Sequence, residues 1–215
     1  MINETLRYLG ITAPSEADRR LAEECLERLK QASPPRYIWR LFPVSREEDG
    51  VALTGTAVRL PGRLADTMLE RCDRAALLAV TLGEGAERLL RREALRDMTR
   101  AAVLDAAASA LVEEGCDRAE KEIAAALPGK YLTDRFSPGY GDLPLTVQPC
   151  LLNTLDAGKR LGITLTDSLL MNPTKSVTAV IGIGDTPQPA RIRGCGHCAM
   201  RDRCAYRKGG RTCHE

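Results

Sequence analysis

One long segment of the sequence, from Glu84 to about Leu127, is rich in Ala, Leu, Glu and Arg. These residue types are strong helix formers. The segment therefore predicts two helices, or one helix with a break near Leu95–Thr99. Small residues at Ala102, Ala106 and Ser109–Ala110 share one face and favour close packing against a neighbouring helix.

Short apolar runs mark the predicted strands. Ala75–Leu82 and Val177–Ile183 are bounded by polar residues and glycine, which favours buried strands over helices. Tyr37–Val44 and Val51–Leu60 flank a polar turn and predict a hairpin-like pair. Shorter helices are predicted at residues 2–9, 15–32, 62–71 and 149–161. Because helices and strands do not alternate regularly, the sequence predicts an α+β fold with a mixed or antiparallel sheet and flanking helices.

Composition excludes several classes of protein. The 215 residues carry a net charge of +2, with 44% hydrophobic residues, so the chain is neither disordered nor strongly basic overall. No segment reaches the roughly 20 apolar residues of a membrane span. The N-terminal stretch carries Glu4 and Arg7 and lacks the apolar core of a signal peptide. We expect a cytoplasmic protein with reduced thiols and no membrane partner.

The last residues form a separate, basic and Cys-rich tail. Residues 191–215 hold seven Arg or Lys against two acidic residues, a net charge of +5, whereas the rest of the chain carries −3. The spacing Cys195-x2-Cys198-x5-Cys204-x8-Cys213 predicts four thiolate ligands. Four thiolates suit either structural zinc or an iron–sulfur cluster. Unmetallated or disulfide-linked cysteines are the third reading, and His197 or His214 could replace one ligand. Residues 190–215 are thus predicted to be a metal-binding tail.

A glycine-rich loop, Arg135-Phe-Ser-Pro-Gly-Tyr-Gly141, is the first candidate binding segment. Its glycines let a ligand approach the backbone closely. Arg135 can hold a carboxylate or a phosphate, and Tyr140 offers a flat face to a ring or a sulfonium. The alternative is an ordinary surface loop in which Arg135 makes a surface ion pair.

The second candidate segment runs from Leu165 to Val177. A strand end leads into a polar loop broken by proline, and a further strand follows. Asp167 could accept a hydrogen bond from an ammonium group, and Lys175 could meet an anion. The alternative is that these polar residues only form turns.

Together the two segments resemble the activation domain of cobalamin-dependent methionine synthase. The resemblance rests on Arg-x-x-x-Gly-Tyr at 135–140 and on Gly-Ile-x-Leu-Thr-Asp-Ser-x-x-Met-x-Pro at 162–173, followed by Ser-Val at 176–177. Leu6–Gly10, Val80–Gly83 and Asp105 add support. The resemblance covers about residues 1–185. We expect the domain to act here as a free-standing subunit.

The resemblance implies a function. Such a domain binds S-adenosylmethionine and docks on a corrinoid-binding methyltransferase subunit when the cobalamin of that subunit is oxidised to cob(II)alamin. By the resemblance, the expected methyltransferase is methionine synthase. A flavodoxin or ferredoxin type donor reduces the cobalt, and the ligand's methyl group then gives methylcobalamin. The protein orients its ligand and excludes water, so no catalytic acid or base is expected.

The resemblance also implies site residues. Arg135 holds the ligand carboxylate, and the backbone of Ser137, Pro138, Gly139 and Tyr140 meets the adenine and ribose. Asp167 and Ser168 lie nearby. The acidic partner of the ligand ammonium is unassigned, with Asp134, Asp142 and Asp167 as candidates.

Two other functions stay open. The body could be a scaffold for the tail, which would make the protein a metal-binding interaction module for a corrinoid or redox partner. A nucleic-acid-binding zinc knuckle is the weaker alternative, because Tyr206 is the tail's single aromatic stacking platform. We therefore expect no nucleic-acid partner.

Overall fold

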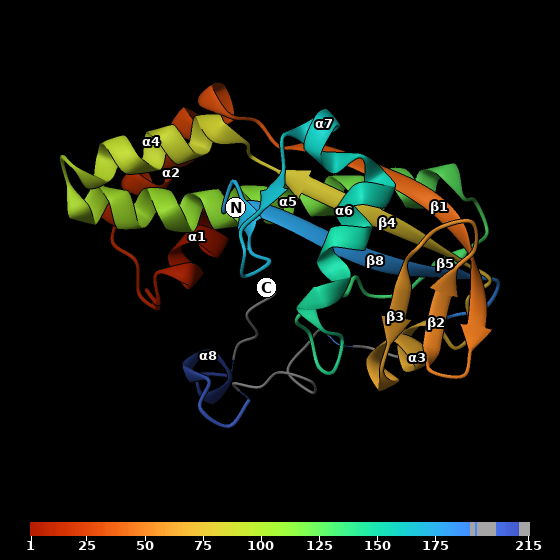
Figure 1. Cartoon of the computed structure of the whole chain (residues 1–215). Helices are drawn as coiled ribbons and strands as arrows, with labels where there is room; N and C mark the ends of the chain where they lie inside the picture. Colours follow the sequence, from red (N-terminus) through yellow and green to blue (C-terminus); the bar gives the residue numbers. More distant parts are fainter. Residues whose placement is uncertain (190–191, 193–200, 211–215) are drawn as a thin grey trace.

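The computed structural model describes residues 1–189, 192 and 201–210 (Figure 1). Its elements, in chain order, are α1 (Ile2–Tyr8), α2 (Glu16–Ala32), β1 (Arg36–Glu47), β2 (Gly50–Leu53), β3 (Arg59–Pro61), α3 (Arg63–Leu69), β4 (Arg74–Thr81), α4 (Glu84–Ala94), α5 (Met98–Ala126), β5 (Tyr131–Leu132), a 3₁₀ turn (Leu145–Val147), α6 (Gln148–Leu155), α7 (Ala157–Leu161), β6 (Thr164–Leu165), β7 (Met171–Asn172), β8 (Ser176–Gly184) and α8 (Ala205–Lys208).

The strands confirm the predicted α+β fold with an antiparallel sheet. Six strands form one sheet in the order β3-β2-β1-β4-β8-β5, and every neighbouring pair is antiparallel. Strands β6 and β7 form a separate two-stranded hairpin. The predicted returning strand at residues 51–60 is in fact two strands, because the chain turns between Leu53 and Val58.

Helices cover both faces of the central sheet (Figure 1). One hydrophobic core joins α1, α2, α4 and α5 to the sheet, and a second joins α3, α6 and α7 to the opposite face. The central strand β4 serves both cores, since Leu78 belongs to the first and Leu77 to the second. This double burial explains why the sequence of β4 is continuously apolar instead of alternating.

Local signals account for the helix boundaries. Ser15 and Asp18 form the capping box that begins α2. The long helical segment does break near Leu95–Thr99, where Asp97 accepts a hydrogen bond from the Arg100 backbone N–H at 3.0 Å and begins α5. The single helix predicted at residues 149–161 is instead α6 and α7, because Asp156 takes a left-handed conformation between them. In the described residues, no helix is long and apolar enough to cross a membrane.

Candidate functional site

The segment that carries Arg135 is anchored on the sheet. Phe136 forms an isolated antiparallel bridge with Val180 of β8, with N–O distances of 3.0 and 2.8 Å. The Phe136 side chain is fully buried in the core that contains α6. Because successive side chains of an extended chain point to opposite faces, Arg135 is directed to the other face, toward α5.

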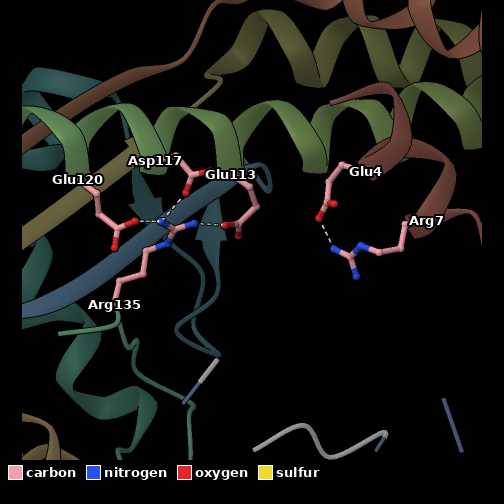
Figure 2. Close-up of polar contacts among 6 residues, drawn as sticks. All are labelled: Glu4, Arg7, Glu113, Asp117, Glu120 and Arg135. Atoms are coloured by element: carbon pink, nitrogen blue, oxygen red, sulfur yellow. Dashed lines mark hydrogen bonds and ion pairs between the residues drawn. The ribbon is translucent and has the colours of Figure 1, made fainter. Parts of the chain in front are cut away.

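Three carboxylates of α5 surround the Arg135 guanidinium (Figure 2). Its Nη2 atom lies 2.5 Å from Glu113, and its Nη1 atom lies 2.7 Å from Asp117 and also contacts Glu120. The acidic residues are four and three positions apart, so they lie on one side of the helix. The Arg135 side chain is only 10% exposed. We call these four residues the Arg135 cluster.

Electrostatics keep the Arg135 guanidinium charged. Burial by itself would lower the pKa of Arg135, but neighbouring negative groups, including Glu120, Asp117 and Glu113, raise the pKa overall. Cys116 lies beside the cluster, and burial raises the pKa of its thiol to about 12, so it is neutral near pH 7. The guanidinium therefore stays positive, and its partners are carboxylates.

A cavity of about 520 Å³ opens beside this cluster. It is lined by Met1, Glu4, Arg7, Tyr8, Ala110, Glu113, Glu114, Asp117 and Arg135. Helix α1 supplies one wall, where Glu4 and Arg7 form an ion pair (Figure 2), and α5 supplies the other. Burial and nearby Glu113 raise the pKa of Tyr8. Carboxylates outnumber arginines on these walls, so the cavity favours a cationic ligand.

The rest of the predicted glycine-rich loop lies outside the cavity lining. Pro138 is buried, Ser137 is half-buried, and Tyr140 is 53% exposed. The Gly139 N–H donates to the Leu143 carbonyl at 2.7 Å, and the backbone of Gly139 has a φ of +94°, which suits glycine. The loop is thus a compact turn that presents an aromatic side chain to solvent.

The candidate acidic residues of this region have different environments. Asp142 accepts hydrogen bonds from the backbone N–H groups of Arg63 and Leu64, at 2.7 and 3.0 Å, and these bonds lower its pKa. Asp134 accepts from the Ile192 backbone N–H at 3.0 Å. Both carboxylates therefore have structural partners, which sequence reasoning did not reveal.

The second predicted segment forms the β6–β7 hairpin. Asp167 and Ser168 are exposed at its turn, and the Ser168 hydroxyl lies 3.0 Å from that of Thr166. Neither residue lines the cavity beside Arg135. Lys175, immediately before β8, contacts Asp105 at 2.9 Å and Ser109 at 3.0 Å, so its ammonium group already has partners on α5.

Sequence reasoning found Arg135 but missed the walls of the cavity. The signal for α5 was present, since Glu113, Asp117 and Glu120 recur at helical spacing. No local signal connects Glu4 and Tyr8 with Arg135, which is more than a hundred positions away along the chain.

The predicted metal ligands fall mostly outside the described residues. Cys195, Cys198 and Cys213 lie there, whereas Cys204 is described, free and partly exposed. Residues 1–189, 192 and 201–210 contain no group of three or more potential metal ligands. The four-cysteine site stays a prediction.

The chain is similar to known proteins in both sequence and fold. The family model described as "Vitamin B12 dependent methionine synthase, activation domain" matches residues 60–202, which include Arg135 and the β6–β7 hairpin. The solved structure "Crystal Structure of the MetH Reactivation Domain bound to AdoHcy" matches with a TM-score of 0.63 and 17% identity. The match covers 99% of this chain and 84% of that one, and shows a shared fold. No curated protein matches the sequence.

Proposed function

Because this chain belongs to the activation-domain family of vitamin B12-dependent methionine synthases, we propose that it binds S-adenosylmethionine and supports reactivation of a cobalamin-dependent methyltransferase. The methyl acceptor is the cobalamin of a partner corrinoid-binding subunit. A flavodoxin or ferredoxin type protein supplies one electron to cob(II)alamin, and the ligand's S–CH₃ bond breaks as a Co–CH₃ bond forms. S-adenosylhomocysteine (AdoHcy) is the other product.

One observation carries the proposal: the family match includes Arg135, and Arg135 lines a cavity of suitable size and charge. Small-ligand pockets are commonly about 300–1,000 Å³. S-adenosylmethionine carries a sulfonium and an ammonium against one carboxylate, so it is a net cation at neutral pH. The acidic walls suit that charge, and the named ligand of the similar solved structure, AdoHcy, is the demethylated form of the same molecule.

The residues of this chain act by binding and orientation. Arg135 holds the ligand carboxylate, and the carboxylates of α5 and α1 balance the positive groups. The backbone of the turn at Ser137–Tyr140, which lies outside the lining of this cavity, is proposed to meet the adenine and ribose, and Asp167 and Ser168 are proposed to lie nearby. The sulfonium methyl is already electrophilic, so the protein needs to supply no acid or base, and correct placement is its main contribution.

The first experiment is calorimetric titration of the protein with S-adenosylmethionine and with AdoHcy. Wild-type protein is expected to bind both, and Arg135→Ala is expected to lose binding because the ligand carboxylate loses its partner. Arg135→Ala also leaves three carboxylates facing one another, so Arg135→Lys, which keeps a positive charge, is measured alongside it. Arg160→Ala, on the exposed side of α7, is the matched control and should bind normally.

The second experiment tests reactivation itself. The protein is mixed anaerobically with a corrinoid-binding methyltransferase in the cob(II)alamin state, a reductant and S-adenosylmethionine, and the cobalamin absorption spectrum is followed. Formation of methylcobalamin that depends on this protein supports the proposal. Binding without any spectral change in the presence of reductant would contradict the reactivation role.

A further inference from the structure

The ion pair between Arg135 and Glu113 lies on the wall of the cavity. Glu113 is the carboxylate paired with Nη2, at 2.5 Å, whereas Asp117 and Glu120 both contact Nη1. The exposed fraction of the side chain is 39% for Glu113 and 20% for Glu120. Glu113 lines the cavity and Glu120 does not. Asp117, which is 56% exposed, also lines the cavity, but it shares Nη1 with Glu120, whereas Glu113 is the partner of Nη2 in this cluster. The Nη2 side of the guanidinium can therefore be released while Nη1 keeps its partners.

The net charge of the Arg135 cluster opposes the simple addition of a ligand carboxylate to its three carboxylates. One guanidinium and three carboxylates give a net charge of 1 − 3 = −2. A ligand carboxylate that approached the intact cluster would meet like charge in a half-buried site, where such repulsion is strong. It can reach Arg135 only if one of the carboxylates moves away and finds another cation.

An α-amino acid group supplies both partners at once. Its carboxylate and ammonium are attached to the same carbon. The carboxylate can therefore replace Glu113 on Nη2, and the ammonium can pair with the released Glu113. The Arg135–Glu113 pair is exchanged for two new ion pairs, and no charge is left without a partner. Leaving a buried charge unpaired would be costly.

We propose that Glu113 is a specificity-determining residue that exchanges Arg135 for the ligand ammonium, and so selects ligands with an intact α-amino-carboxylate end. This inference rests on the proposed function, because it concerns how the same cavity takes S-adenosylmethionine. It also gives the ligand ammonium the acidic partner that the sequence left unassigned. Asp117 and Glu120 are positioning residues that hold the guanidinium in place during the exchange.

The test compares three ligands by calorimetry on the intact protein. S-adenosylmethionine has both charged groups of the amino acid end, decarboxylated S-adenosylmethionine has the ammonium alone, and methylthioadenosine has neither. Wild-type protein is expected to prefer S-adenosylmethionine over each truncated ligand by about tenfold or more. Glu113→Gln is expected to lose most of this preference, with little change in its affinity for methylthioadenosine.

Two further variants separate the exchange from a structural effect. Glu122→Gln changes an exposed carboxylate of the same helix that lies outside the cavity lining and accepts hydrogen bonds from Tyr37 and Trp39 at 2.8 and 2.9 Å, and it should leave all three affinities unchanged. Glu113→Asp keeps the carboxylate and should recover part of the preference. Thermal unfolding of each variant checks that the fold is kept.

The outcomes distinguish this inference from the proposed function. If wild type and Glu113→Gln bind S-adenosylmethionine equally tightly, the exchange is overturned and the proposed function stands. An equal loss of affinity for all three ligands in Glu113→Gln would also overturn it, since that result indicates general damage to the cavity. If the wild-type protein binds none of the three ligands, both proposals are overturned.

Discussion

Burial controls the reactivity of individual cysteines in this protein. Cys116 is fully buried on α5, between the Arg135 cluster and the sheet core, and burial raises the pKa of its thiol to about 12. The thiolate is the reactive form of cysteine. Cys72 is half-buried, and burial raises the pKa of its thiol to about 11. Neither residue has the low pKa that a catalytic or redox-sensing thiol requires.

We predict that iodoacetamide at pH 8 modifies Cys116 only after unfolding. At that pH, a pKa of about 12 leaves about one thiol in ten thousand ionised, and the folded protein also blocks access. Peptide mass spectrometry of native and guanidinium-treated protein measures the modified fraction. Equal labelling rates in the two states would contradict the burial of this residue.

The packing of α5 on the sheet depends on one glycine in the middle of the helix. A Cβ atom at Gly115 would lie 2.7 Å from the Pro35 Cβ and 2.9 Å from the Val80 Cγ1. Both atoms belong to stiff, packed residues, so they cannot easily move away. The long helix can thus approach β1 and β4 closely because this position has no side chain.

We predict that Gly115→Ala destabilises the protein although alanine favours helices. Alanine gains about 1 kcal/mol in helix propensity, but overpacking costs about 1–3 kcal/mol, so a net loss of about 1 kcal/mol is expected. The matched control is Gly158→Ala in α7, where a Cβ would make an ordinary contact of 3.5 Å with the Ile163 carbonyl. Urea unfolding of both variants measures the difference, and a stabilised Gly115→Ala would refute the close contact.

The molecule as a whole depends on β4, which joins its two hydrophobic cores. Leu77 and Leu78 are both fully buried, but their side chains point to opposite faces of the sheet. Strand β4 also pairs along its length with β1 on one side and β8 on the other. Unfolding of either core therefore removes support from the other.

We predict that Leu77→Ala and Leu78→Ala each lower the free energy of unfolding by about 2–5 kcal/mol and keep a single transition. Circular dichroism reports mainly on the helices, and fluorescence of Trp39, the single tryptophan, reports on β1. The two signals should coincide in every variant. Leu95→Ala, whose side chain is 90% exposed, is the control and should change little. Separate transitions would mean that the cores unfold independently.

Much of the architecture could be predicted because its signals are local. The helix-forming run before Pro128, the apolar run of β4 and the capping box of Ser15 act within a few residues, so they determined the main helices, the central strand and the α+β class. Motif spacing likewise identified the family and Arg135. The break at Asp156 was missed, because a left-handed residue between two short helices leaves the apolar pattern unchanged.

The surroundings of Arg135 were decided by the tertiary structure alone. The bridge between Phe136 and Val180 determines which face Arg135 points to, and a shift of one residue would reverse it. Packing of α1 beside α5 then adds Glu4 and Tyr8 to the same cavity. Sequence by itself determined the main helices, the central strand and the family to which the chain belongs. Long-range pairing brought three carboxylates to one guanidinium, since side-chain direction depends on strand register, which no local pattern encodes.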